Sequence, residues 1–350
     1  MEWLLMSVAA SARGSAPALR VLCMDIEGAR GGSSRSLYHL LRWLDRTNCE
    51  VEVWCRNSGM IEEWYAAEGI GCTVKPELPR FTAPRPGFRE TVHQIRVALP
   101  PFLKSLKFVR SWAAEIEERF DIVHFNHPAF FMLSYLLRQY TRKPFVMHIR
   151  TRPDNTMIAR WQARLISKVV DRLIFITENE RCHFQDLGGT SGGDVIYNVP
   201  GVLEDPTPSD LVPKDERLKV ASLSNYVWVR GVDRIVEVAA VLANRGRRDI
   251  LFVMAGNMKL HTSSPGMLGE IGNSGGSLSD YVDQKGLSDM FLFTGHVTDP
   301  ERLALACDVM IKLTREYNPW GRDTIECLYL GRPAISIGSW DTFIVHEETG

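Results

Sequence analysis

The 350-residue sequence lacks the features of several protein classes. Neither sign of charge dominates, since 41 Lys and Arg residues balance 42 Asp and Glu residues and leave a formal net charge of -1. A generic nucleic-acid-binding protein is more basic, so the charge gives that function no support. No apolar run approaches the roughly 20 residues that a membrane-spanning helix needs. Hydrophobic residues still make up 45% of the chain, which is typical of a folded globular protein.

Cysteine is scarce as well. The chain has 7 cysteines, and none of them belongs to a C-x-x-C pair. Their odd number and irregular spacing argue against a disulfide framework and against a zinc site. We therefore expect a protein of a reducing compartment, most simply the cytoplasm.

Short apolar runs alternate with helical patterns through the first part of the chain. The runs lie at residues 20–26, 51–55, 121–125, 144–148 and 173–176, and each is typical of a buried parallel strand. After the first run, leucines recur at helical spacing, at Leu37, Leu40, Leu41 and Leu44. This alternation predicts a parallel sheet with helices on both faces.

The character of the chain changes after residue 199. Prolines among acidic residues predict a linker over 200–216. Strands are then expected at 218–223, 250–254, 290–293, 309–311 and 334–337, and the Gly- and Ser-rich stretch 259–276 is predicted to be a mobile loop. The whole is an α/β protein with an N-terminal extension (1–18), two Rossmann-like domains (19–199 and 217–350) and a ligand cleft between them.

The strongest local signal is a loop that enters a helix near residue 320. The backbone amides of Trp320, Gly321 and Arg322 would lie at the helix N-terminus, where free N–H groups and the helix dipole favour a phosphate. Glu326 lies one turn further on, where a carboxylate can accept both hydroxyls of a ribose. The alternative is an ordinary capped helix with a solvated Glu326.

Residues 318–335 resemble the donor-site signature of retaining glycosyltransferases of family 4, which have the GT-B fold. The family pattern is E-x-F-G-x-x-x-x-E-A-x-x-x-G-x-P-V-I. Trp320 and Gly321 match its aromatic–glycine pair, and Glu326 matches its second glutamate. Asn318 stands where the first glutamate is found, a position that in the family touches hydroxyls of the donor sugar. An amide can still bond these hydroxyls but carries no charge.

Residues 222–231 resemble the family's G-R-x-x-x-x-K-G segment, whose Arg and Lys hold the donor diphosphate. Arg230 falls on the Lys position, and Asn225 replaces the Arg, so one of two cations is missing. A guanidinium can bind phosphate through two hydrogen bonds, which would compensate in part. The alternative is a surface arginine at the start of a helix.

Three features of the first domain also resemble the family. His148 ends a strand at the position of the histidine that reaches the donor sugar, and His124 and His127 are weaker candidates. Gly31 and Gly32 resemble the glycine pair that lets the backbone approach substrate. Residues 195–198 resemble the V-I-x-N element at the interdomain hinge. The glycines form no G-x-G-x-x-G pattern, which argues against a dehydrogenase.

The resemblance implies transfer of a sugar from a nucleotide-diphosphate donor to an acceptor hydroxyl, with retention at the anomeric carbon. Arg230 and the amides near Gly321 would stabilise the leaving diphosphate, His148 would orient the sugar, and Glu326 would hold the ribose. The leaving diphosphate oxygen would accept the acceptor's proton. The family uses no bound metal or other cofactor. The acceptor would be a glycan or a lipid-linked molecule of cell-surface polysaccharide or glycolipid synthesis.

Two alternatives stay open. The first is a nucleotide-sugar-binding protein of the same fold that has lost transfer activity, which Asn225 and Asn318 favour because each replaces a charged family residue. The second is a sugar-nucleotide epimerase on this fold. Residues 343–350 resemble the family segment before its last strand and helices. We therefore expect the second domain to be incomplete and the chain to be a fragment.

Residues 80–112 combine basic and apolar side chains. Seven Lys and Arg residues stand against one glutamate, Glu90, with apolar residues interleaved. Such a stretch can lie on an anionic membrane surface, so one expectation is a peripheral contact at the inner face of the membrane. The alternative is a helix with one core face and one solvated basic face.

Overall fold

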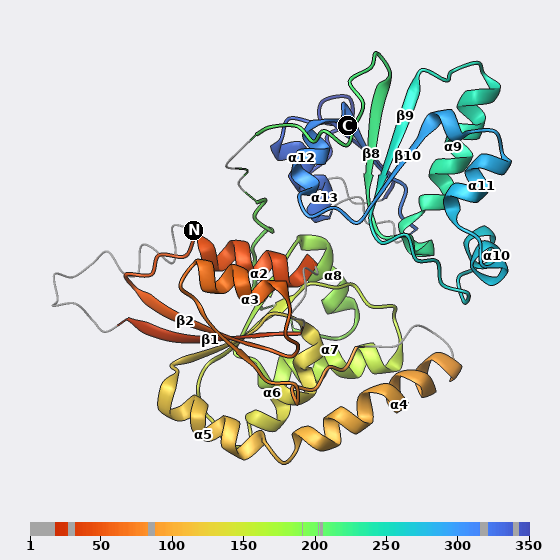
Figure 1. The fold of residues 1–350 in the computed structure, drawn as a ribbon. Helices are drawn as coiled ribbons and strands as arrows, with labels where there is room; N and C mark the ends of the chain where they lie inside the picture. Colours follow the sequence, from red (N-terminus) through yellow and green to blue (C-terminus); the bar gives the residue numbers. More distant parts are fainter. Residues whose placement is uncertain are drawn as a thin grey trace. The chain divides into compact units, whose positions relative to one another are not determined.

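The computed structural model describes residues 18–26, 32–82, 88–190, 192–201, 203, 206–315, 321–338 and 343–350. The chain divides into two compact units, Met1–Val199 and Pro200–Gly350. Each unit is a parallel sheet with helices on both of its faces (Figure 1). The described residues between 200 and 217 contain neither helix nor strand.

The first unit holds a seven-stranded sheet in the order β3-β2-β1-β4-β5-β6-β7, and every pair of neighbours is parallel. The order reverses direction between β1 and β4, and ligands of open α/β sheets bind at the carboxyl ends of strands on either side of such a point. The strands are β1 Leu19–Asp25, β2 Cys49–Cys55, β3 Gly71–Val74, β4 Ile122–Phe125, β5 Phe145–Ile149, β6 Arg172–Phe175 and β7 Asp194–Val195.

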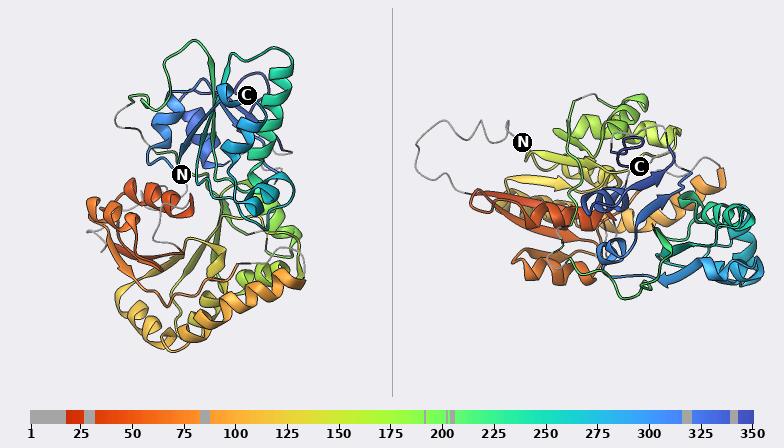
Figure 2. Two further views of the ribbon diagram at one scale, coloured as in Figure 1. Left: turned by 45° about the vertical axis from the view of Figure 1, so that its right-hand side comes forward. Right: turned by 90° about the horizontal axis from the view of Figure 1, so that it is seen from above.

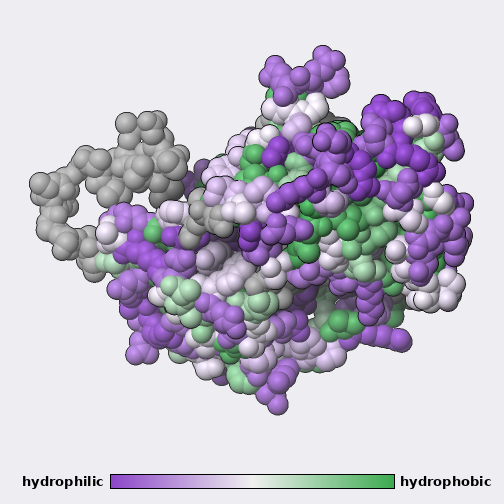
Figure 3. All heavy atoms as spheres, turned by 45° about the horizontal axis from the view of Figure 1, so that its top comes forward, coloured by the Kyte–Doolittle hydropathy of each residue, from purple (hydrophilic) through white to green (hydrophobic). Residues whose placement is uncertain are grey.

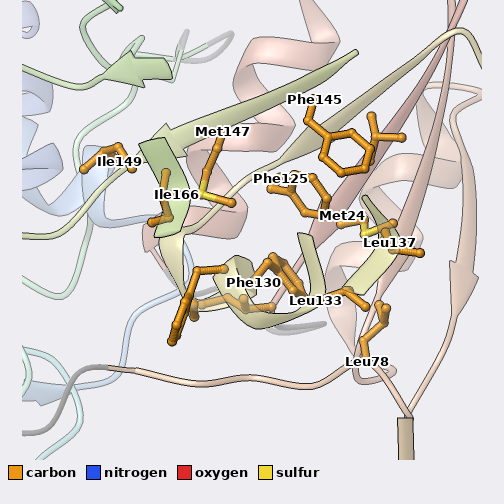
Figure 4. Close-up of a cluster of buried hydrophobic side chains, with 14 of the residues drawn as sticks. Met24, Leu78, Phe125, Phe130, Leu133, Leu137, Phe145, Met147, Ile149 and Ile166 are labelled. Atoms are coloured by element: carbon orange, nitrogen blue, oxygen red, sulfur yellow. The ribbon is translucent and has the colours of Figure 1, made fainter. Parts of the chain in front are cut away.

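Helices cover both faces of this sheet because side chains of a strand alternate between the two faces. Cys23 packs with α2 and α3 on one face, whereas Met24 packs with α5, α6 and α7 on the other. Figure 1 shows the helices on the two faces of the sheet. Figure 4 shows side chains of the cluster that contains Met24. In it the rings of Phe125 and Phe145 meet edge to face, with 5.2 Å between their centroids. The helices are α2 Gly32–Arg42, α3 Met60–Ala67, α4 Phe88–Ser105, α5 Val109–Arg119, α6 Phe131–Leu137, α7 Met157–Val169 and α8 Glu178–Asp186.

The second unit holds a five-stranded parallel sheet in the order β10-β9-β8-β11-β12. Helices α9, α10 and α11 pack on one face, and α12 and α13 cover the other (Figure 2). The strands are β8 Leu218–Leu223, β9 Ile250–Ala255, β10 Phe291–Gly295, β11 Val309–Lys312 and β12 Ala334–Ser336. The helices are α9 Val232–Asn244, α10 Met267–Ser274, α11 Leu278–Gln284, α12 Pro300–Leu305 and α13 Arg322–Tyr329.

The expected α/β fold and its strands are confirmed, with boundaries that differ by one or two residues. The prediction of a loop over 259–276 is wrong in part, because α10 lies within it. Gly266 begins this helix with a φ of 62°, and the apolar side chains of Leu268 and Ile271 fall on one face and are buried in the core of the unit. The many Gly and Ser residues concealed that short apolar pattern.

Hydrophilic side chains predominate on the face drawn in Figure 3, with apolar residues visible between them. Among the described residues, no helix is long and apolar enough to cross a membrane. Several large apolar side chains are nevertheless exposed, and helix α4 carries a series of them at Phe88, Ile95, Val97, Leu99 and Leu103.

Candidate functional site

Polar side chains gather at the carboxyl ends of β1, β4 and β5 in the first unit. Asp25 ends β1 and is fully buried, and its Oδ1 accepts hydrogen bonds from the Ile26 amide and from Asn126 Nδ2, both at 2.9 Å. Arg150 follows β5 and donates from Nε to the side-chain oxygen of Asn126 at 2.9 Å and from Nη1 to Asn198 Oδ1 at 2.8 Å. Burial raises the pKa of Asp25, although these hydrogen bonds and the Arg150 charge oppose the shift.

His148 lies beside this network in β5. Its ring is 4% exposed, and its Nδ1 is 2.7 Å from Nε2 of His124 in the adjacent strand β4. Burial and the positive charge of Arg150 lower the pKa of both histidines. His127 is also buried, and its Nδ1 accepts a hydrogen bond from the Ala129 amide. At neutral pH this edge of the sheet therefore presents uncharged imidazoles close to the Arg150 guanidinium, with Arg80 also acting on His127.

Gly32 is the first residue of α2. A Cβ at Gly32 would meet no atom within 4 Å, so the described residues give this glycine no packing role. The close approach of backbone to substrate stays a prediction. Gly31 lies outside the described residues.

In the second unit, the loop after β8 is fixed by a glycine and a partly buried ion pair. Gly231 has a φ of 68°, and a Cβ there would collide with the carbonyl oxygen of Leu313. Arg315 binds both carboxylate oxygens of Asp233, at 2.7 and 2.6 Å, and its guanidinium stacks on the Trp228 ring. These contacts hold residues 228–231, and therefore Arg230, against the end of β11.

Asn225 stabilises the loop after β8 through a hydrogen bond to the loop after β9. Its side chain is exposed, and its Oδ1 accepts a hydrogen bond of 2.9 Å from the backbone amide of Asn257, which follows β9. The asparagine therefore ties together the loops after two neighbouring strands. An arginine at this position would bring a charge but would lose this acceptor.

A charged cluster lies at the start of α13. The Lys312 ammonium, at the end of β11, is 2.7 Å from Asp323 Oδ1 in the first turn of the helix, and the lysine is 3% exposed. Burial opposes ionisation of Asp323, but Lys312 and Arg230 outweigh it and lower the pKa of this carboxyl. A Cβ on Gly321 would collide with Lys312 Nζ, so the glycine provides the room that the ion pair occupies.

Glu326 is 4% exposed and forms an ion pair with Arg322 one turn earlier in α13. The alternative of a solvated Glu326 is therefore wrong. A carboxylate has about four lone-pair sites, so Glu326 can bond Arg322 and still accept a ligand hydroxyl. Asn318 and Trp320 lie outside the described residues.

The structure thus brings together His148 and His124 in the first unit. In the second unit, Arg230 and Gly321 are linked through Asp323, on which the Arg230 charge acts and against which Gly321 lies. Sequence reasoning missed Lys312 and Asp323. Lysine is unusual at the end of a buried strand, and this was the signal that could have pointed to it. It also missed Asp25, whose position at the end of the first apolar run was a comparable signal.

Residues 30–199 match the family model described as Glycosyltransferase Family 4, and residues 205–350 match the one described as Glycosyl transferases group 1. The chain belongs to the GT-B glycosyltransferases. The resemblance to this family is therefore confirmed. No curated protein matches the sequence of this glycosyltransferase.

Solved structures confirm the GT-B fold of this glycosyltransferase. Anabaena HepE in complex with UDP-glucose is 17% identical, with a TM-score of 0.64 over 90% of this chain and 79% of that chain. Sucrose-phosphate synthase from Thermosynechococcus elongatus is 16% identical, with a TM-score of 0.67 over 95% of this chain and 85% of that chain. A glycosyltransferase from Rickettsia africae ESF-5 is 17% identical, with a TM-score of 0.64 over 93% of this chain and 81% of that chain.

Proposed function

We propose that this glycosyltransferase moves a sugar from a nucleotide-diphosphate donor to an acceptor hydroxyl, with retention at the anomeric carbon. Structures of the similar Anabaena HepE contain UDP and UDP-glucose, which supports a donor of that class. We assign donor binding to residues 217–350 and acceptor binding to residues 19–199, with 200–216 as the linker.

The charged cluster at the start of α13 is the observation that carries this proposal. Lys312 pairs with Asp323 in the first turn of α13, and Arg230 is close enough to act on the same carboxylate, so two cationic side chains lie where the helix presents its N-terminal amides. Negative charge builds on the diphosphate as it leaves, and fixed positive groups in a site of low dielectric stabilise it strongly. The departing oxygen can then take the proton of the acceptor hydroxyl.

The other assigned residues bind the remaining parts of the donor. His148 contacts the sugar, Glu326 accepts hydrogen bonds from the ribose hydroxyls, and the Gly321 amide faces the diphosphate. Gly31, Gly32, Asn318 and Trp320 complete the substrate contacts, with Asn225 next to the diphosphate and Arg322 holding Glu326.

Isothermal calorimetry with UDP-, GDP- and ADP-sugars tests donor binding, with Glu326→Ala as the variant expected to lose affinity. Turnover of the donor that binds is then measured, and the anomeric configuration of the product is determined by NMR. An inverted product would refute retention. Binding without transfer or hydrolysis would favour the inactive binding protein, and an altered sugar without a new glycosidic bond would favour the epimerase.

Helix α4 supports an acceptor at a membrane surface. Ile95, Leu99 and Leu103 are spaced at i, i+4 and i+8, so they form one stripe of the helix, and all three are exposed. A helix with one core face and one basic solvated face would bury such a stripe. Exposed lysines and arginines flank it, at Arg96, Lys104, Lys107 and Arg110. We propose that this surface contacts anionic lipid, which suits an enzyme of polysaccharide or glycolipid synthesis.

A further inference from the structure

His124 and His148, two of the buried histidines of the first unit, make a hydrogen bond that has only one proton to share. His124 Nε2 and His148 Nδ1 are 2.7 Å apart, and the rings meet edge to face with 86° between their planes. Their exposed fractions are 7% and 4%. One ring must therefore donate and the other accept, and the direction decides which nitrogen of each ring carries a proton.

Both rings are uncharged at neutral pH. Burial, together with the positive charge of Arg150, lowers the pKa of His124 to about 3 and lowers the pKa of His148 as well. Arg150 is held in place by Asn126 and Asn198. A neutral imidazole carries a single N–H, so a ring that accepts at one nitrogen has its proton on the other.

Only one direction of the hydrogen bond between His124 and His148 leaves both rings in their favoured tautomer. If His124 donates from Nε2, then His148 accepts at Nδ1, and both histidines carry their proton on Nε2. If His148 donates from Nδ1, both carry it on Nδ1. Neutral histidine side chains in water prefer the Nε2–H form, so the first arrangement is favoured at both rings.

We propose that His124 is a positioning residue that keeps His148 in its Nε2–H form, so that His148 offers a hydrogen-bond donor to an oxygen of the donor sugar. Among the residues that the structure describes, no second group bonds to the His148 ring, which leaves Nε2 for the ligand. This inference rests on the proposed function, in which His148 contacts the sugar, and it adds the direction of that contact.

NMR of the full chain tests the tautomer without any substrate. In the ¹⁵N-histidine-labelled protein, long-range ¹H–¹⁵N spectra should show a protonated Nε2 and a bare Nδ1 for His148, assigned with a His148→Gln sample. His124→Gln should preserve this pattern, because its carboxamide N–H lies close to the position of the histidine Nε2–H. His124→Leu should abolish the pattern of a protonated Nε2 and a bare Nδ1, and the two ring nitrogens of His148 should give averaged ¹⁵N shifts.

His127→Asn is the matched control for loss of a buried imidazole. Its side-chain oxygen can still accept from the Ala129 amide, as His127 Nδ1 does, so the local turn is kept. The His148 pattern should be unchanged in this variant. A thermal melt of each variant separates loss of the fold from loss of the hydrogen bond.

Kinetics test the consequence for transfer. With a donor that turns over, His124→Leu should lower kcat roughly tenfold to a hundredfold with a smaller change in donor KM, and His124→Gln should restore most of the loss. A protonated Nδ1 on His148 in the wild type, or equal kcat for the Leu and Gln variants, would overturn the inference. If the wild type turns over no donor, the proposed function fails, and the spectra alone decide the tautomer.

Discussion

At the scale of single residues, the space around Gly321 favours a glycine although its backbone is extended, because a Cβ would displace the ends of the Lys312 and Asp323 side chains. Its φ is -178°, a value open to any residue, so among the described residues the steric restriction comes from Lys312 and Asp323. Gly321 could be predicted as a site residue because it matches a position of the family motif. The ion pair beside it could not be predicted, because Lys312 and Asp323 come from different elements.

Gly321→Ala should therefore separate Lys312 from Asp323. We expect a loss of roughly 1–3 kcal/mol in the free energy of unfolding, since a buried ion pair would be distorted, and a clear loss of donor affinity. Denaturant unfolding and calorimetry measure the two effects. Gly71→Ala is the control, because a Cβ there meets only Glu52 Cγ at an ordinary 3.6 Å. Equal behaviour of the two variants would contradict the packing argument.

Asn225→Arg should restore the second cation of the family motif. We expect donor affinity to rise about tenfold through charge-assisted hydrogen bonds to the diphosphate. The Asn257 amide loses its acceptor, at a cost of about 1 kcal/mol in unfolding free energy. Asn225→Ala loses the same acceptor without adding charge, so it separates the two effects. An unchanged or weaker affinity for the Arg variant would place the diphosphate elsewhere.

Glu180 should make stability depend on pH. It is 2% exposed in the first turn of α8, next to the Thr177 cap, and burial raises its pKa from 4.5 to about 7. Between these values the native state binds a proton that the unfolded state has released, so stability falls as pH rises, by roughly 3 kcal/mol in total.

Glu180→Gln removes this ionisation and keeps a side chain of the same shape. Its unfolding free energy should change less between pH 5 and pH 8, and at pH 8 it should exceed that of the wild type. Urea unfolding at both values measures the difference. The same pH dependence in both proteins would show that Glu180 ionises at its ordinary pKa.

At the scale of elements, strands were easier to predict than helices. Buried parallel strands such as β9 are continuous apolar runs, and such runs stand out in a sequence. Helix α10 escaped prediction because glycines and serines surround its few apolar residues. Helix α4 contains Pro100 and Pro101, residues that usually break a helix, so its basic and apolar character could be predicted from the sequence but its continuous 18 residues could not.

The exposed stripe of α4 predicts binding to anionic vesicles. Leu99→Asp/Leu103→Asp should lower the fraction that sediments with phosphatidylserine-containing vesicles by about tenfold or more, because two carboxylates enter an apolar, anionic contact. Met157→Asp on α7 is the control, since Met157 is also an exposed apolar residue of this unit. Equal loss of vesicle binding in the two variants, or a wild-type protein that does not sediment with the vesicles, would refute the contact.

At the scale of the whole molecule, alternation of strands and helices was enough to predict two parallel-sheet units. The side-chain pairs that shape each site could not be predicted in this way. Asp25 and Asn126 are 101 residues apart in sequence and meet only because β1 and β4 are neighbours in the sheet. The order of strands in the sheet decides which side chains come into contact, and the apolar pattern of a strand does not reveal which strands lie next to it.

The boundary between the units predicts the result of limited proteolysis. Residues 206–209 and 213–216 are mostly exposed and lie outside helices and strands, so a protease should cut there first. We expect two main fragments, which mass spectrometry would assign to residues before and after this stretch. First cleavage inside either sheet would contradict the division at Val199 and Pro200.

Each core cluster of the described residues draws its members from one unit alone. A half exchanged by genetic recombination would therefore bring its complete interior with it. Under the proposed division of donor and acceptor binding between the units, such an exchange would combine a new nucleotide preference with an old acceptor, and a chimera made in the laboratory would do the same.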